Sequence, residues 1–386
     1  MSIYLDHAAT VPMVDEAAAA LTAQMRVVGN ASSLHSDGRA VRKAVEDARL
    51  SISELIGCEA SEIIFTGTGT EADNLAIKGF YWNAVAANPS RNIILSSAIE
   101  HHAVKDPIEW LVEHEGARSI EIPVLADGVI DLNFLRDYVE AHRDSIALIS
   151  VMHSNNEIGA VQPVAEVVAI AGEIPVHTDA VQSLGKIDFN FAKLGVTAAT
   201  ISSHKVGGPL GVAALILKRG LDITPVTHGG GQERDVRSGT FNAPSIVAFA
   251  EAAKVALTKR DLEFKRISEL RDYAAKEILQ AIPDASLNGA AGLPGILNIS
   301  FPNTESEALL LLLDSEGISA SAGSACSAGV ARPSHVLLAL GRSEEEAMSS
   351  LRFSLGTTTT QQDIERLVEV LPSVVSRARA AFSVKK

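Results

Sequence analysis

The chain has 386 residues, of which 47% are hydrophobic and 21% charged, and its net charge is −14. This length allows a large core and two domains, while the acidic balance argues against a nucleic-acid or anionic-membrane partner. The start, Met1–Asp6, lacks the features of a signal peptide, and the longest apolar run, Ala308–Leu313, is too short to span a bilayer. Two cysteines, Cys58 and Cys326, predict neither a disulfide framework nor a metal site, which favours the reducing cytoplasm.

Short apolar strands alternate with helical patterns from about residue 60 to 220. The predicted strands are Glu62–Thr66, Asn92–Ser97, Ser119–Val124, Ile146–Val151, Pro175–Thr178, Thr197–Ser202 and Val212–Leu217. The predicted helices between them are Glu71–Ala86, His102–His114, Leu132–Ala141 and Val164–Ala171. This alternation predicts an α/β fold with a mainly parallel sheet, whose ligands bind at the carboxyl ends of the strands.

The pattern changes after about residue 250. We expect one or two long helices over Glu251–Ile282, followed by a strand, a helix, a segment of small residues, a strand and a final helix at Ile296–Phe301, Glu305–Ser315, Ile318–Gly329, Leu351–Leu355 and Gln361–Phe382. The sequence therefore predicts a large domain over residues 15–250. A smaller α+β domain would combine residues 1–14 with residues 251–386.

A lysine and an acid follow two of the predicted strands. Lys205 comes just after the apolar run Val196–Ile201, and Asp179 follows the strand at Pro175–Thr178. An amine at the edge of a core loses solvation, so its pKa falls and it can attack a carbonyl. Such a pair suits pyridoxal phosphate, because the lysine forms a Schiff base and the acid keeps the pyridine nitrogen protonated.

Two further segments near strand ends are candidates for contacts with this cofactor. Thr66–Glu71 links a strand to a helix, and the free N–H groups of a helix N-terminus suit a phosphate. A plain turn capped by Thr70 is the alternative. His101 follows the strand Asn92–Ser97 and would stack on a planar ring, unless it only caps the next helix or faces solvent beside His102.

Polar groups gather at other strand ends. Asn155 and Asn156 follow the strand Ile146–Val151 and are good ligand donors, although asparagine also suits a plain turn. Asp179 and Gln182 place an acid and an amide three residues apart. The glycine-rich stretch 228–240 indicates either a closely approached backbone or a surface linker.

The segment Ser321–Gly329 carries one thiol, Cys326, among small neighbours that offer it no core. An exposed loop of this kind predicts a delivered nucleophile, whereas we expect Cys58 to be a small buried side chain. Arg352 lies in an apolar strand and needs an anionic partner, which is either a substrate carboxylate or an internal ion pair.

Taken together, these segments resemble the cysteine desulfurases, the NifS-like group of the class V aminotransferase superfamily. The resemblance runs nearly end to end, through Tyr4–Thr10, Asn30–His35, Glu100–His101, Asn155–Glu157, Asp179–Gln182, Ser202–Lys205, Gly323–Cys326, Pro333–Val336 and Arg352–Leu355. It implies a fold-type I transferase with a seven-stranded sheet. Small departures from the family pattern occur at His7, at Gly67–Thr70 and at Ala322.

The resemblance also implies a role for each candidate residue. Lys205 would hold pyridoxal phosphate covalently, with Asp179 on the pyridine nitrogen, Gln182 on the ring hydroxyl and His101 on the ring face. The phosphate would be bound by Gly69, Thr70, Ser202 and His204, and by Thr240 of a second subunit, so a homodimer is expected. The substrate carboxylate would be bound by Asn156 and Arg352, with Asn156 also next to the cofactor.

The implied reaction converts L-cysteine to L-alanine. Lys205 removes the Cα proton, His101 shuttles a proton, and the Cys326 thiolate takes the sulfur as a persulfide. An acceptor such as an iron–sulfur scaffold then receives the sulfur, and a transient contact of Cys326 with an iron–sulfur cluster is the one metal contact implied. The alternative enzyme is a selenocysteine lyase or a related lyase. The alternative that is not an enzyme is a catalytically inactive scaffold that binds sulfur-transfer partners.

Overall fold

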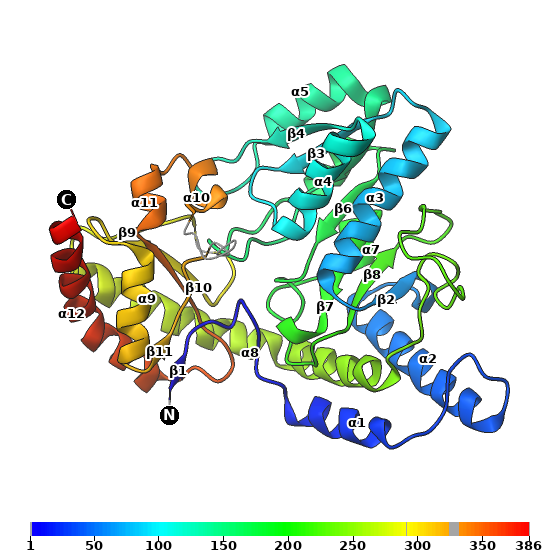
Figure 1. The fold of residues 1–386 in the computed structure, drawn as a ribbon, viewed down its shortest axis with the longest axis horizontal. Coiled ribbons are helices and arrows are strands. Elements are labelled where there is room, and N and C mark those ends of the chain that lie inside the picture. The colour runs from blue at the N-terminus through cyan, green and yellow to red at the C-terminus, as the bar shows by residue number, and fades with distance from the viewer. Residues whose placement is uncertain (1, 291, 324–331, 386) are drawn as a thin grey trace.

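The computed structural model describes residues 2–290, 292–323 and 332–385, and its largest element is a seven-stranded sheet (Figure 1). The strands are β2 (Ile63–Thr66), β3 (Ile93–Ser97), β4 (Arg118–Ile122), β5 (Ile146–Ser150), β6 (Val176–Asp179), β7 (Ala198–Ser202) and β8 (Ala213–Leu217). Their order is β2-β8-β7-β6-β5-β3-β4, and only β8 runs antiparallel to its neighbours. All seven predicted strands are present, so the predicted mainly parallel α/β fold is confirmed.

Helices cover both faces of this sheet. Successive residues of a strand pack on opposite faces of the sheet. Ile64 packs with α3 (Gly69–Ala87) and α4 (His102–Glu115), whereas Ile63 and Phe65 pack in the hydrophobic core on the other face. That core also contains side chains from α1 (Asp15–Met25), α2 (Ser36–Ile56), α5 (Leu132–His142), α6 (Val164–Ala171), α7 (Phe191–Leu194) and α8 (Ala243–Ala281). Strands buried on both faces explain the continuous apolar runs in the sequence.

A second hydrophobic core lies around a smaller antiparallel sheet. Its strands, in the order β12-β10-β9, are β12 (Ser350–Ser354), β10 (Ile296–Ser300) and β9 (Ser286–Leu287). It is packed against α9 (Ser306–Ser315), α12 (Gln361–Lys385) and the second half of α8. The N-terminal strand β1 (Ile3–Tyr4) pairs in parallel with β11 (Ile318–Ser319), and Leu5 is buried in this core. The first residues of the chain therefore pack with its last third.

Helix α8 joins the two cores as one continuous element (Figure 1). It begins at Ala243, before the predicted start at Glu251, and a length of 39 residues corresponds to roughly 58 Å. Phe249 packs in the first core and Ile278 in the second. The predicted division at residue 250 thus falls inside a helix, and the assignment of two domains stays a prediction.

Several helices were not predicted from the sequence, among them α1 and α2. Helix α2 buries Val41, Val45 and Ile52 on one face and ends at Gly57, whose φ of 71° is left-handed and suits glycine. The shorter elements are the helices α10 (His335–Ala339) and α11 (Glu344–Met348) and the 3-10 turns η1 (Ala60–Glu62), η2 (Arg143–Ser145) and η3 (Ser203–Lys205). Within the described ranges, no helix has the length and apolar character needed to cross a bilayer.

Candidate active site

A cavity of about 460 Å³ lies at the carboxyl ends of the central strands. Every predicted site residue lines it except Thr240 and Cys326; those that do are Gly69, Thr70, His101, Asn156, Asp179, Gln182, Ser202, His204, Lys205 and Arg352. Thr240 is exposed and does not line this cavity, and Cys326 lies outside the described residues. Among the residues that the structure describes, no cluster of His, Cys, Asp or Glu is suited to holding a metal ion.

One end of the cavity is formed by the N-terminus of α3. Thr68 caps this 19-residue helix by accepting a hydrogen bond from the Glu71 backbone N–H at 3.0 Å. A Cβ at Gly69 would lie 3.2 Å from the Val181 side chain, so glycine lets the start of the helix approach the segment after β6 closely. The first N–H groups of a helix lack intrahelical partners and carry positive partial charge. This end of the cavity therefore suits an anion of phosphate size.

Asp179 is held at the end of β6. Its Oδ1 accepts a hydrogen bond of 2.8 Å from the Val181 backbone N–H. Burial raises the pKa of the Asp179 carboxyl to about 6, although the Val181 N–H and the charge of Lys205 favour the ionised form. A buried carboxylate in this position can hold a proton on a neighbouring nitrogen.

Lys205 stands in the 3-10 turn η3, directly after β7. Its Nζ donates hydrogen bonds to the carbonyl oxygens of Ala8 at 2.6 Å and Ala9 at 2.7 Å. Burial and the charge of Arg352 lower the pKa of the Lys205 amine to about 8, against the opposing effect of Asp179. An amine with this pKa is partly unprotonated near neutral pH, so Lys205 has the chemistry of a nucleophile or base.

His101 caps helix α4 and opens onto the cavity. Its Nδ1 accepts a hydrogen bond of 3.1 Å from the Ala103 backbone N–H. Desolvation by the cavity walls and the charge of Lys205 lower the pKa of the His101 ring to about 4. A neutral ring that accepts at Nδ1 carries its hydrogen on Nε2, which leaves Nε2 available as a donor.

Arg352 forms an internal ion pair, which the sequence analysis gave as one of two possible anionic partners. Its Nη2 donates to Asp6 Oδ1 at 2.7 Å, and its Nη1 donates to the Asn156 carbonyl oxygen at 3.0 Å. The buried Nε atom has no hydrogen-bond partner among the described residues. Because Arg352 lines the cavity, its guanidinium group places a positive charge in the cavity wall that suits an anionic ligand.

The segment after β5 is organised by Asn155 rather than by Asn156. Asn155 is fully buried, and its Oδ1 accepts from the backbone N–H groups of Glu157 at 2.8 Å and Ile158 at 2.9 Å. The turn interpretation is therefore correct for Asn155. Glu157 in turn accepts a hydrogen bond of 2.6 Å from Ser334, beyond the segment that carries Cys326.

The glycine-rich stretch is tied to helices α3 and α2 of the large-sheet layer at two points. Arg237 Nε donates to Glu71 Oε1 at 2.7 Å, and the buried Glu233 pairs with Arg49 at 3.0 Å. Thr240 follows these anchors and is exposed. This geometry is that of a fixed loop rather than a free linker.

Three residues in or beside the cavity were not assigned by the sequence analysis. Asp6 pairs with Arg352, and Asp73 lines the cavity with an Oδ1 atom that has no hydrogen-bond partner within the described ranges. Burial and the nearby Asp179 raise the pKa of Asp73 well above its usual value. Lys186 donates to Gln182 at 2.5 Å. Helical spacing from Gly69 to Asp73 and the i, i+4 spacing from Gln182 to Lys186 were the available signals.

The other cysteine, Cys58, is half-buried rather than fully buried as expected. Cys58 packs against the first core, and burial with the charges of Glu62 and Glu59 raises the pKa of its thiol to about 12. Such a thiol stays protonated and unreactive at neutral pH.

Comparisons with known proteins agree with this architecture. The family model of class V aminotransferases matches residues 3–367. An IscS-like cysteine desulfurase of Mycobacterium tuberculosis is 47% identical over 383 residues, which cover 98% of this chain and 97% of that protein. The cysteine desulfurase IscS of Dictyoglomus turgidum is 42% identical over 389 residues, with 100% and 97% covered.

A solved structure described as a NifS-like protein superposes with a TM-score of 0.90 at 32% identity and covers 98% of this chain and all of its own. The NifS-like protein of Rickettsia africae gives a TM-score of 0.87 at 34% identity, with 97% and 100% covered. These matches confirm the fold-type I architecture. The chain belongs to the class V aminotransferase family, among its NifS- and IscS-like cysteine desulfurases.

Proposed function

We propose that this protein is a pyridoxal phosphate-dependent cysteine desulfurase that converts L-cysteine to L-alanine and keeps the sulfur as a persulfide on Cys326. The observation that carries the proposal is the single cavity that brings together Lys205, Asp179 and the N-terminus of α3. An amine, a buried acid and an anion site at its walls match the three anchoring points of pyridoxal phosphate.

The described residues fit this cofactor. Lys205 would hold it covalently, Asp179 would face its ring nitrogen and His101 its ring. Gly69, Thr70, Ser202 and His204 would bind the phosphate, at the helix N-terminus where no Cβ intrudes. When bound, the cofactor supplies a sink for negative charge at the substrate Cα.

The chain's own groups would move the protons and the sulfur. Lys205, whose pKa is lowered to about 8, takes the Cα proton, and His101 would shuttle a proton for the substrate thiol. The Cys326 thiolate attacks the substrate sulfur. An S–S bond forms as the Cβ–S bond breaks, and Cβ gains a proton to give alanine.

Arg352 would bind the substrate carboxylate through its guanidinium group, which places a positive charge in the cavity wall. Arg352→Met should raise the KM for L-cysteine on the order of 10- to 100-fold, because a charge-assisted hydrogen bond is lost. Steady-state kinetics measure this, with Arg366→Met, at a half-exposed ion pair, as the control. A KM equal to the parent's, with only a lower melting temperature, would make Arg352 a structural partner of Asp6.

Asp179→Asn should lower kcat/KM about 100- to 1000-fold, since an amide cannot hold a proton on the ring nitrogen through charge. Kinetics of the cofactor-loaded variant measure the loss, and Asp188→Asn, at an exposed aspartate, is the control. Parent-like kcat/KM in a fully loaded Asp179→Asn variant would remove the assigned role.

The proposal extends to the assembly and its partners. Thr240, exposed after the anchored loop, would bind the phosphate in a second subunit, so the working unit would be a homodimer. The large domain would cover residues 15–250 and the small one residues 1–14 and 251–386. The persulfide would pass to an acceptor such as an iron–sulfur scaffold in the cytoplasm, where a reducing environment preserves the Cys326 thiol.

A comparison of substrates tests the function. The loaded enzyme is incubated with L-cysteine, and separately with L-selenocysteine, in the presence of a reductant, and alanine is measured. Alanine from L-cysteine is the expected result. Alanine from L-selenocysteine alone would favour a selenocysteine lyase, and a protein that neither binds the cofactor nor makes alanine would overturn the proposal.

A further inference from the structure

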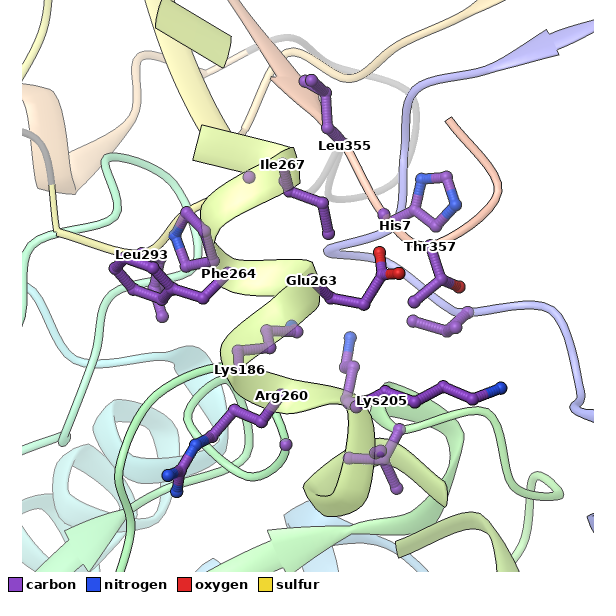
Figure 2. Close-up of a pocket in the computed structure, with 18 of the residues that line it drawn as sticks. His7, Lys186, Lys205, Arg260, Glu263, Phe264, Ile267, Leu293, Leu355 and Thr357 are labelled. Atoms are coloured by element: carbon purple, nitrogen blue, oxygen red, sulfur yellow. The ribbon is translucent and has the colours of Figure 1, made fainter. Parts of the chain in front are cut away.

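A second lysine lies directly behind the candidate active site. Lys186 is half-buried and lines a separate cavity of about 240 Å³ next to helix α8, which it shares with Lys205 and His7 (Figure 2). Its Nζ donates a hydrogen bond of 2.5 Å to Gln182 Oε1. Gln182 lines only the larger cavity, so Lys186 reaches the active site through the Gln182 amide.

The Gln182 amide is fixed at both ends. Oε1 accepts from Lys186, while Nε2 donates to the Ala8 carbonyl oxygen at 2.9 Å. A side-chain amide carries two donor hydrogens on nitrogen and lone pairs on oxygen, and a flip exchanges them. Flipping this amide would break both of these hydrogen bonds, because NH₂ would face the Lys186 amine and an oxygen would face the Ala8 carbonyl oxygen. The second Nε2 hydrogen remains as the amide's free donor.

The Ala8 carbonyl links this arrangement to Lys205. It accepts hydrogen bonds from Gln182 Nε2 and from Lys205 Nζ at 2.6 Å. Lys205 lines both cavities, whereas Lys186 lines only the smaller one. Lys186 therefore stands behind Gln182 as a support and cannot replace Lys205 in contact with a ligand.

We propose that Lys186 is a positioning residue, which holds the Gln182 amide so that its NH₂ group, and not its oxygen, faces the hydroxyl oxygen attached to the cofactor ring. The proposal rests on the proposed function and on the contact of Gln182 with the ring hydroxyl that the family resemblance implies. A flipped or mobile amide would place an oxygen beside an anionic oxygen. Lys186 thus sets the hydrogen bonding of the cofactor without touching it.

The test is a double-mutant cycle on the cofactor-loaded protein, read from the pH midpoint of its visible absorption band. A hydrogen-bond donor to the ring hydroxyl oxygen reduces the negative charge on that oxygen, and this charge favours protonation of the nitrogen that joins Lys205 to the cofactor. We therefore expect Lys186→Met to raise the midpoint by about 1 pH unit, the size of one lost hydrogen bond. Gln182→Met should raise it similarly, and the double variant should show no further shift.

Two controls separate positioning from charge and from folding. Lys259→Met removes an exposed lysine of the same small cavity, and Lys186→Arg retains a donor; both should keep the parent midpoint. An unshifted midpoint in Lys186→Met, or an equal added shift in the Gln182→Met background, would overturn the proposal. If Lys186→Met does not bind the cofactor, Lys186→Arg provides the test. A midpoint of Lys186→Arg that is shifted as far as that of Gln182→Met would overturn the proposal.

Failure of this inference can be told apart from failure of the proposed function. A parent protein that shows no visible cofactor band and forms no alanine refutes the function itself. A parent that is yellow and active, with a midpoint insensitive to Lys186, refutes only the positioning role.

Discussion

Lys205→Ala should give a folded protein that no longer forms the covalent bond to pyridoxal phosphate and releases alanine about 10³-fold more slowly or worse. The side chain supplies both the amine that binds the cofactor and the base that takes the Cα proton, so one substitution removes two functions. Its hydrogen bonds to Ala8 and Ala9 and its lowered pKa place a reactive amine at the wall of the cavity.

The measurement for Lys205→Ala is the absorption spectrum after reduction with borohydride and removal of free cofactor, together with alanine release. The parent should keep its cofactor after this treatment, and the variant should not. Lys193→Ala, at an exposed lysine of α7, is the matched control and should behave as the parent. Cofactor retained covalently by Lys205→Ala would mean that another lysine is the attachment point.

Cys326→Ala should remain yellow but lose persulfide formation altogether, with alanine release falling about 10³-fold. Alanine at this position leaves the cofactor residues untouched, because none of them lies in the segment that carries the thiol. The chain offers a matched control in Cys58, whose thiol pKa is raised to about 12 and which packs against the core. Cys58→Ala should therefore keep both colour and sulfur transfer.

Mass spectrometry of protein treated with L-cysteine measures this second prediction. The peptide that contains Cys326 should gain one sulfur atom in the parent and in Cys58→Ala. If Cys326→Ala released sulfide and alanine at the parent rate, the sulfur would leave by a route that does not use this thiol.

The residues at strand ends could be predicted because the apolar strand directly before each of them marks its position in the fold. Lys205 and Asp179 follow apolar strands, and parallel strands bring their carboxyl ends to one edge of a sheet. Gly69 and Thr70 were recognisable as a helix N-terminus after a strand. Six strands of the large sheet are buried on both faces, which leaves short apolar runs in the sequence, whereas the edge strand β4 is largely exposed and alternates polar and apolar residues.

The contacts that cross the chain could not be predicted in this way. Asp6 and Arg352 are 346 positions apart, and no local pattern shows that β1 and β12 converge on one cavity. The long helix α8 was placed too late in the chain because its first turns are apolar and small, like the end of a core strand pattern, while its charged turns begin after residue 250. Lys186 gave only an i, i+4 spacing, which many unpaired residues share.

The measurement that tests the account most directly is alanine formation from L-cysteine by the loaded enzyme without any reductant. If the sulfur stays on Cys326, alanine should appear as a burst of about one molecule per subunit and then stop, and a reductant should restart it. Continuous release of alanine without reductant, or no alanine from a protein that carries the cofactor, would contradict a desulfurase that stores its sulfur on this thiol.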